Sequence, residues 1–367
     1  MAVERLDSDR TVLDLAYERV EDCFRRFDRV VVAFSGGKDS TVILNLAADV
    51  ARARGADPVE VLHWDEEAVH PETTAYVARV AAREDVRLLW YCYPVKHRNA
   101  CSRESPWWYP WAEEARDLWV RDLPATAITR VPCAYQPRKP VTEMTGFALR
   151  EPVSTVILTG VRAQESLQRM QSVTRSPDGW LSVNKHAPHT VNAKPMYDWR
   201  LEDVWTAPKL LGWDYNRTYD VFAAAGVALN DQRVSPPFGD ESLQNLTHYA
   251  ECWPELWAKL VRRVPGAATA GRYSKTAVYG FSDRRKAPPE GMTWREAIAD
   301  AIRQWPEEVR PHVADNVRRA IQAYVKHNRR PVPDTAPAGE VSWSELLLLA
   351  QRGGLNGQRL RATNVTP

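Results

Sequence analysis

The sequence predicts an α/β protein in which helices cover both faces of a twisted parallel sheet, followed by a mainly helical C-terminal region. Three observations support this fold class. Short apolar, β-branched runs alternate with segments of helical periodicity through about the first 160 residues. The runs are apolar along their whole length, which is typical of strands covered on both faces. Beyond about residue 203 the strand patterns stop and helical ones continue.

The elements of the α/β part follow in order. An amphipathic helix is predicted from Val12 to Phe27, and Asp7 or Ser8 can cap its start. Strands are then expected at 29–34, 59–64, 86–91 and 154–159, and helices at 39–54 and 71–83. Such alternation is the pattern of βαβ units, whose strands run parallel.

The remaining segments are rich in Trp and Pro or helical in pattern. We interpret residues 94–140 as an insertion over the sheet, with one helix at 113–121. Further helices are predicted at 218–225, 254–264, 293–304, 306–327 and, after a Pro-rich linker, 342–352. The chain therefore divides into an α/β domain at 1–205, a mainly helical region at 206–330, and a linker, short helix and tail at 331–367.

The composition excludes several classes of protein. A chain of 367 residues with 44% hydrophobic and 26% charged residues is typical of an ordinary globular protein with about two domains. The 49 basic and 47 acidic residues nearly cancel, so an anionic partner must meet a local patch. No apolar run is long enough to span a membrane, and we expect no membrane association. Five scattered cysteines without paired spacing indicate the reducing cytoplasm.

The strongest chemical pattern is the segment Ser-Gly-Gly-Lys-Asp-Ser-Thr at 35–41, between a predicted strand and a helix. Glycines let the backbone approach a ligand, and the first free amides of a helix attract an anion. The spacing does not fit a Walker A loop, because Val32 stands where that loop needs Gly and Asp39 where it needs Ser or Thr. An anion-binding loop of another kind is therefore expected.

This segment resembles the SGGxDS pyrophosphate loop of the adenine nucleotide alpha-hydrolase superfamily, which includes ATP pyrophosphatases and phosphoadenosine phosphosulfate (PAPS) reductases. The resemblance implies a Rossmann-like fold, ATP or PAPS as ligand, and reaction at the α-phosphorus. It also implies that Lys38 adds positive charge and that Asp39 helps to hold Mg²⁺. The phosphates would be cradled by Ser35, Gly36, Gly37, Ser40 and Thr41.

A second pattern follows a later strand, in the segment 159–169. At helical spacing, one face would carry Arg162, Glu165, Ser166 and Arg169. Guanidinium groups suit phosphate or sulfate, and the carboxyl end of a strand is where α/β sheets bind ligands; a solvated salt-bridged face is the alternative. With Gly160, the segment resembles the GxRxxES motif of PAPS-reductase-like proteins. The two resemblances together imply a catalytic set of Lys38, Asp39, Arg162 and Arg169.

Two further positions have both a ligand-binding and a structural interpretation. Asp65 ends the second strand and is well placed for the nucleotide or its metal, although acidic loops are commonly only solvated. The segment with Asp198 and Trp199 resembles the one that closes the family core. These residues would either contact the ligand or start a helix with the tryptophan packed in the core.

Several other segments resemble one subfamily of these proteins. It comprises phage- and prophage-associated PAPS-reductase-like proteins, includes a regulator of immunoglobulin-binding protein expression, and is often encoded beside a ParB-like partner. The resemblance covers about residues 20–330 and implies a ParB-like protein as partner. The segments are 62–67, 119–121, 236–240, 257–259 and 271–275.

The cysteines bear on the type of reaction. PAPS reductases use a Glu-Cys-Gly motif on a C-terminal tail, whereas no cysteine follows Cys252 here. Cys92, Cys101 and Cys133 lack paired spacing, so no iron–sulfur cluster is expected. The resemblance then favours cleavage of ATP to AMP and pyrophosphate, which activates a substrate for sulfur or other modification. The alternatives are a PAPS or adenylyl-sulfate reductase, and a non-catalytic nucleotide-binding regulator acting with a ParB-like partner.

A basic segment at 271–286 indicates one class of substrate. Positive charges that follow a phosphate backbone, with rings on which bases stack, are typical of single-stranded nucleic-acid binding. An ordinary basic surface loop is the alternative. The charged residues are Arg272, Lys275, Arg284, Arg285 and Lys286. Nucleic acid is therefore the leading macromolecular substrate.

Overall fold

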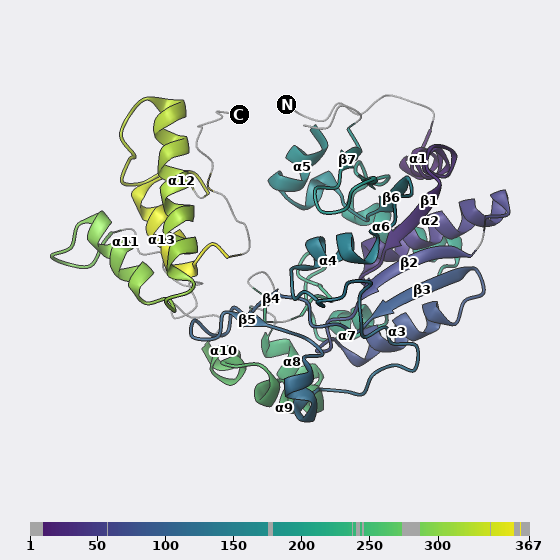
Figure 1. Cartoon of the computed structure of the whole chain (residues 1–367), viewed down its shortest axis with the longest axis horizontal. Helices are drawn as coiled ribbons and strands as arrows, with labels where there is room; N and C mark the ends of the chain where they lie inside the picture. The colour runs from purple at the N-terminus through teal and green to yellow at the C-terminus, as the bar shows by residue number, and fades with distance from the viewer. Residues whose placement is uncertain are drawn as a thin grey trace. The chain divides into compact units, whose positions relative to one another are not determined.

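The protein folds as two compact units (Figure 1). The first comprises Met1–Lys96 and Tyr109–Pro236, and the second comprises His97–Trp108 and Pro237–Pro367. The first unit extends past residue 205, where the sequence suggests a boundary. The computed structural model describes residues 10–56, 58–174, 179–236, 238–239, 243, 246–273, 287–337, 339–355 and 360.

The first unit is built on a six-stranded sheet with the order β3-β2-β1-β6-β8-β7. The predicted strands are present as β1 (Arg29–Ala33), β2 (Val59–Trp64), β3 (Val86–Tyr91) and β6 (Thr155–Leu158). They run parallel to one another and to β8 (Thr190–Ala193), while β7 (Leu181–Val183) is an antiparallel edge strand. The parallel α/β fold is thus confirmed.

Helices cover both faces of this sheet, as the sequence predicts. Alternate residues of β1 show this, because Val32 packs into one apolar core and Val31 into the other. The first core contains residues of α1 (Val12–Arg26), α2 (Lys38–Arg54), α3 (Pro71–Ala81) and α6 (Leu201–Leu211). The second core lies beneath α4 (Val141–Ala148).

Helix α1 begins later than the predicted caps would place it. Thr11 accepts a hydrogen bond from the Asp14 amide (3.2 Å), and the Asp14 carboxylate accepts one from the Thr11 amide (2.8 Å). This reciprocal capping box satisfies two free amides at the helix start. Thr11 therefore caps the helix, and Asp7 and Ser8 lie outside the described residues.

The Trp- and Pro-rich insertion differs from the prediction in its helix. Residues Glu113–Leu118 form a 3₁₀ helix instead of an α-helix at 113–121, and Ala115 has non-helical angles (φ −118°, ψ 22°). The chain leaves the helix at Trp119, whose indole donates a hydrogen bond to the Ala112 carbonyl (3.1 Å). The short hairpin of β4 (His97–Arg98) and β5 (Trp107–Trp108) belongs to the second unit.

The second unit confirms the mainly helical C-terminal region. Helix α12 begins four residues later than predicted, because residues 306–309 form a turn closed by a Val309 N–H to Pro306 carbonyl bond (2.9 Å). No helix of the described chain is long and apolar enough to cross a membrane. The helices are α8 (Leu246–Cys252), α9 (Pro254–Arg263), α10 (Ala267–Tyr273), α11 (Trp294–Arg303), α12 (Arg310–Asn328) and α13 (Trp343–Arg352).

Trp199 provides a test of the first core. Its side chain is 1% exposed, and its indole donates a hydrogen bond to the Val12 carbonyl (3.0 Å). We expect Trp199→Ala to lower the free energy of unfolding by about 3–5 kcal/mol in urea denaturation, because it leaves a large cavity. The control is Leu210, which lies on α6 and is 72% exposed. Leu210→Ala should change the free energy of unfolding by less than about 0.5 kcal/mol. Equal losses in the two variants would contradict the packing described.

Candidate functional site

The phosphate loop lies where β1 ends and α2 begins, at the carboxyl edge of the sheet. Gly36 has φ +76°, and a Cβ atom there would lie 3.2 Å from the Thr73 methyl group. Gly37 is the residue before the first turn of α2 and has no side chain to cap that turn. The backbone thus carries both the left-handed turn and the first free amides of a 17-residue helix, whose positive end attracts anions.

The hydroxyl groups of two predicted phosphate ligands bond within the loop. The hydroxyl groups of Ser40 and Thr41 donate hydrogen bonds to the Gly37 carbonyl (2.9 and 3.0 Å). Both residues are buried, and the Ser40 hydroxyl also accepts a hydrogen bond from the Ser35 amide (3.2 Å). Ser35 itself lines a cavity beside the loop.

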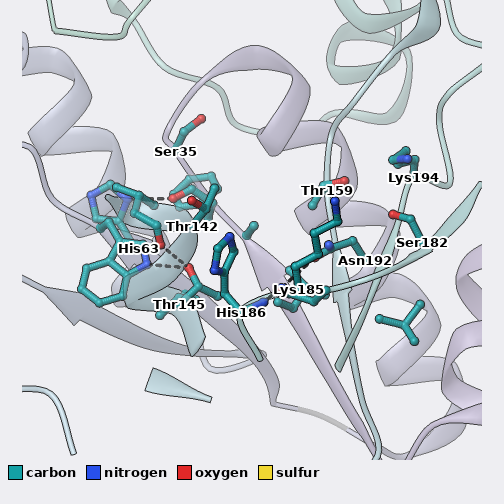
Figure 2. A pocket seen from close by; sticks show the side chains of 18 of the residues that line it. Ser35, His63, Thr142, Thr145, Thr159, Ser182, Lys185, His186, Asn192 and Lys194 are labelled. Atoms are coloured by element: carbon teal, nitrogen blue, oxygen red, sulfur yellow. Dashed lines mark hydrogen bonds between the residues drawn. The ribbon is translucent and has the colours of Figure 1, made fainter. Parts of the chain in front are cut away.

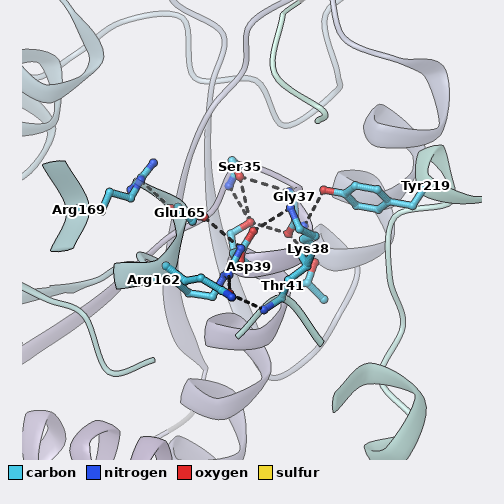
Figure 3. A network of polar contacts seen from close by, with 12 residues as sticks. Ser35, Gly37, Lys38, Asp39, Thr41, Arg162, Glu165, Arg169 and Tyr219 are labelled. Atoms are coloured by element: carbon cyan, nitrogen blue, oxygen red, sulfur yellow. Dashed lines mark hydrogen bonds and ion pairs between the residues drawn. The ribbon is translucent and has the colours of Figure 1, made fainter. Parts of the chain in front are cut away.

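The loop is also held by residues that the sequence motifs do not identify. The Tyr219 hydroxyl, on α7 (Thr218–Ala224), accepts a hydrogen bond from the Lys38 amide (2.9 Å), as Figure 3 shows. The Asn216 side-chain amide donates to the Gly36 carbonyl (2.9 Å) and to the Thr73 hydroxyl (2.8 Å). Burial raises the pKa of the Tyr219 hydroxyl, so it stays protonated. Nothing in the local sequence distinguishes these residues from ordinary helix and turn positions.

A chain of alternating charges joins the two predicted motifs (Figure 3). The Asp39 carboxylate pairs with Arg162 (Nε to Oδ1, 2.5 Å) and with Lys38 (Nζ to Oδ2, 3.2 Å). Glu165 then bridges Arg162 (3.5 Å) and Arg169 (2.6 Å). The Arg162 side chain is only 5% exposed, whereas that of Arg169 is 47% exposed. The structure therefore brings together all four residues of the predicted catalytic set.

The sequence predicts that Arg162, Glu165, Ser166 and Arg169 share one helix face. This prediction is wrong, because the segment is not one helix. Residues Ala163–Glu165 form a short 3₁₀ turn, and Ser166 is extended (φ −165°, ψ 157°). Helix α5 (Leu167–Thr174) begins only after it, and the Ser166 hydroxyl accepts a hydrogen bond from the Arg169 amide (3.2 Å). Ser166 thus caps a helix instead of facing a ligand in this arrangement.

Gly160 allows the two loops to touch. A Cβ atom at this position would lie 2.7 Å from the carbonyl carbon and oxygen of Asp39, which real side chains do not tolerate. The loop after β6 can therefore lie directly on the first turn of α2. This contact places Arg162 beside Asp39.

Asp65 is bonded to side chains of β3 and of the Trp-rich insertion. Its buried carboxylate accepts hydrogen bonds from the indoles of Trp90 (2.6 Å) and Trp111 (3.3 Å) and pairs with Arg121. Burial acts to raise the pKa of Asp65, but the charges of Arg121 and His63 and the hydrogen bonds from Arg121 and Trp90 together lower it. The Glu67 carboxylate accepts a further bond from the Trp111 amide (2.7 Å). These carboxylates anchor the insertion to the end of β2.

Asp198 and Trp199 also have structural roles. The Asp198 carboxylate accepts two hydrogen bonds from Arg19 of α1 (2.9 and 2.8 Å), and Trp199 packs in the core. Of the basic segment, Arg272 is exposed near the end of α10. Lys275, Arg284, Arg285 and Lys286 lie outside the described residues.

A cavity of about 1240 Å³ lies beside the phosphate loop (Figure 2). Ser35, Thr159 and His63 line it at the carboxyl edge of the sheet, and Lys185 and His186 line it from the β7–β8 hairpin. His63 bonds the Phe34 carbonyl through Nδ1 (2.8 Å), and burial lowers the pKa of its ring.

Glu66 lines the same cavity at the end of β2. Burial and the neighbouring Asp65 charge raise the pKa of its carboxyl to about 8, so this group is mostly neutral at pH 7.

A divalent cation would depend on Asp39. In the described part of the chain, no group of three or more His, Cys, Asp or Glu residues could hold a metal ion by itself. Mg²⁺ usually binds through one or two carboxylates together with the phosphates of a substrate. Asp39, in the first turn of α2, fits this mode because its carboxylate lies beside the amides that would receive those phosphates.

Comparison with known proteins places this geometry in a family. Residues 29–222 match the phosphoadenosine phosphosulfate reductase domain, and residues 226–333 match a domain of unknown function, DUF3440. The uncharacterized protein YbdN of Escherichia coli (strain K12) is 30% identical over 344 residues, covering 89% of this chain and 83% of YbdN.

Two solved structures resemble the chain more distantly. Phosphoadenylyl-sulfate reductase from Candida auris, in a phosphate complex, has a TM-score of 0.33 and 15% identity, over 56% of this chain and 84% of that one. Candida glabrata FMN adenylyltransferase, with FAD and inorganic pyrophosphate, has a TM-score of 0.36 and 12% identity, over 60% and 64% of the two chains. The family match spans more than half of the chain. The protein therefore belongs to the phosphoadenosine phosphosulfate reductase domain family.

Proposed function

We propose that the protein binds an adenine nucleotide at the phosphate loop and cleaves it at the α-phosphorus, releasing AMP and pyrophosphate while it activates a substrate. The observation that carries this proposal is the Asp39–Arg162 ion pair. It places a buried guanidinium beside the first amides of α2. Membership of the family and this paired anion site together favour a nucleotide as the ligand.

The amino terminus of α2 would receive the phosphates. The Gly37 and Lys38 amides lie there and donate to the hydroxyls of Ser35 (3.3 Å) and Tyr219 (2.9 Å), and the positive end of the helix supports negative charge. The Tyr219 hydroxyl already accepts a bond from the Lys38 amide, so its own proton is directed elsewhere and can be donated to a phosphate oxygen. Tyr219 would thus position the phosphate from the side opposite to Arg162.

Asp39 would exchange partners when phosphates bind. In the structure its carboxylate compensates the charges of both Lys38 and Arg162. Phosphate oxygens can replace it as the counterion of these two groups, since guanidinium forks suit phosphate. The released carboxylate could then share Mg²⁺ with the pyrophosphate group, and the cation would offset the negative charge of this leaving group.

The cysteines favour activation over reduction. None of the five, all of which lie in the described part of the chain, lines the cavity. Cys23, Cys92 and Cys101 are buried, and burial raises the pKa of the Cys92 thiol, so it remains protonated and unreactive. Sulfur transfer, nucleic acid as substrate and a ParB-like partner remain predictions from the sequence.

The first prediction concerns the loop glycines. With Mg²⁺ and α-labelled ATP, we expect AMP and pyrophosphate as products. A comparison of the AMP yield with and without single-stranded DNA tests nucleic acid as the substrate. Gly36→Ala should reduce AMP formation at least about tenfold, because its φ of +76° and the Thr73 contact oppose a side chain. Gly55→Ala is the control, since Gly55 also has a positive φ but lies at the far end of α2.

Other products would lead to different conclusions. Formation of ADP would contradict chemistry at the α-phosphorus. Nucleotide binding without any product would favour a regulator that only senses the nucleotide. Turnover of PAPS that depends on a cysteine would favour the reductase alternative.

The second prediction concerns Asp39. Asp39→Asn frees Lys38 and Arg162 from their counterion, so we expect metal-free pyrophosphate to bind about tenfold more tightly, equivalent to about 1.4 kcal/mol. The Mg²⁺-dependent gain in affinity should disappear. Isothermal titration calorimetry with and without Mg²⁺ measures both effects. Asp49→Asn, on the same helix, should leave both values unchanged, and weaker pyrophosphate binding by Asp39→Asn would contradict the exchange of partners.

The third prediction concerns Tyr219. Removing the hydroxyl in Tyr219→Phe leaves the Lys38 amide without its acceptor and should weaken pyrophosphate binding several-fold. It should also lower the free energy of unfolding by about 1 kcal/mol. The matched control is Tyr215→Phe, because the Tyr215 hydroxyl donates to Asp220 (2.9 Å) and not to the phosphate loop. Unchanged binding in Tyr219→Phe would show that this residue supports the fold and not the phosphate.

A further inference from the structure

The cavity beside the phosphate loop is larger than one ligand requires. Its volume of about 1240 Å³ exceeds the roughly 300–1,000 Å³ that is typical for a small-molecule site. The lining includes Thr159, directly after β6, and Lys185, in the turn before β8. These two parallel strands pair from Thr155 with Thr190 to Leu158 with Ala193, so at a rise of about 3.3 Å per residue their ends are roughly 13 Å apart. The cavity is therefore a groove that follows the sheet from its carboxyl edge to its amino edge.

The floor of this groove is apolar. Three positions on neighbouring strands supply it, namely Ala33 of β1, Leu62 of β2 and Ile157 of β6, all on the face that α4 covers. On α4, Val141 faces the same space. Such a surface favours an apolar body over the ribose and phosphates of a nucleotide.

The amino end of the groove is basic. The β7–β8 register pairs Leu181 with Ala193 and Val183 with Val191, so the turn between these strands lies at the amino edge of the sheet. This turn contributes Lys185 and His186, and no carboxylate among the described residues forms an ion pair with Lys185. Figure 2 shows both side chains between Thr145 and Asn192. The single carboxyl group of the lining, Glu66, belongs to the opposite edge.

The turn that presents these groups is held in place. The Asn184 side-chain oxygen Oδ1 accepts hydrogen bonds from the His186 amide (2.9 Å) and the Ala187 amide (3.2 Å), and the Asn184 side-chain amide donates to the Asn192 side-chain oxygen (3.2 Å). On α4, a Cβ atom at Gly146 would lie only 2.0 Å from the His186 carbonyl oxygen, so only glycine permits this approach. The basic end is thus built by two elements that lock together.

We propose that this groove binds an elongated organic anion with an apolar body, whose acidic group lies at Lys185 and His186 and whose other end reaches the phosphate loop. This ligand would be the substrate that the nucleotide activates: an oxygen at its end near the phosphate loop would bond to the α-phosphorus as pyrophosphate leaves, so the proposal rests on the proposed function. Its chemical class is an acyl or aryl chain that carries a carboxylate, sulfonate or phosphate. Charge complementarity at one end and apolar burial along the floor would select it.

The test uses 8-anilinonaphthalene-1-sulfonate, an aromatic sulfonate whose fluorescence rises on burial, with the full-length protein. We expect saturable binding of one probe per chain. Octanoate should displace it, whereas octanol should not, because octanol lacks the charge. Lys185→Glu should weaken probe binding at least tenfold. Lys209→Glu, an exposed lysine on α6 outside the groove, should leave it unchanged.

Three results would overturn the proposal: probe binding that does not saturate, equal affinities in Lys185→Glu and the wild type, or one-for-one displacement of the probe by MgATP. The last would mean that the nucleotide itself fills the groove. The proposed function fails by a different result, namely ATP binding that Gly36→Ala leaves unchanged. Calorimetry with ATP on the same samples distinguishes the two failures.

Discussion

The ion pair between Asp39 and Arg162 is the interaction on which the site depends. It connects the first turn of α2 to the loop after β6, two segments that are 123 positions apart in the sequence. Arg162 is buried, and a buried charge without a partner is strongly destabilising. Asp39 and the more distant Glu165 are its carboxylate partners. The pair that stabilises the fold is also the one that we propose to open when phosphate binds.

The elements around this pair hold the phosphate loop from several directions. Asn216 and Tyr219 fix its backbone from the segment around α7, and Gly160 lets the loop after β6 lie against it. At the neighbouring strand, Asp65 and Glu67 use buried hydrogen bonds to fasten the Trp-rich insertion. The three acidic residues after β2 therefore differ in their surroundings. Asp65 and Glu67 hold the insertion in place, whereas Glu66 lines the cavity.

Much of the fold follows from the sequence because apolar periodicity reports burial, and β1, β2 and β6 are largely or wholly buried. The hairpin of β7 and β8 escapes prediction, because strands of three and four residues with polar positions carry no clear period. Helical spacing in the sequence predicts that the charges around Arg162 lie together, but in the structure it is contacts between loops that bring them together. Asp65 shows the same limit, since its partners Trp111 and Arg121 come from a distant insertion.

The most direct test is a crystal structure with Mg²⁺ and an ATP analogue that has a methylene group between the α- and β-phosphorus atoms. The account predicts phosphate oxygens at the amino terminus of α2, on the Tyr219 hydroxyl and on the Arg162 guanidinium. It also predicts that Asp39 has left Arg162 and contacts the metal. Phosphates bound elsewhere, or an Asp39–Arg162 pair that is unchanged with the analogue in place, would contradict it.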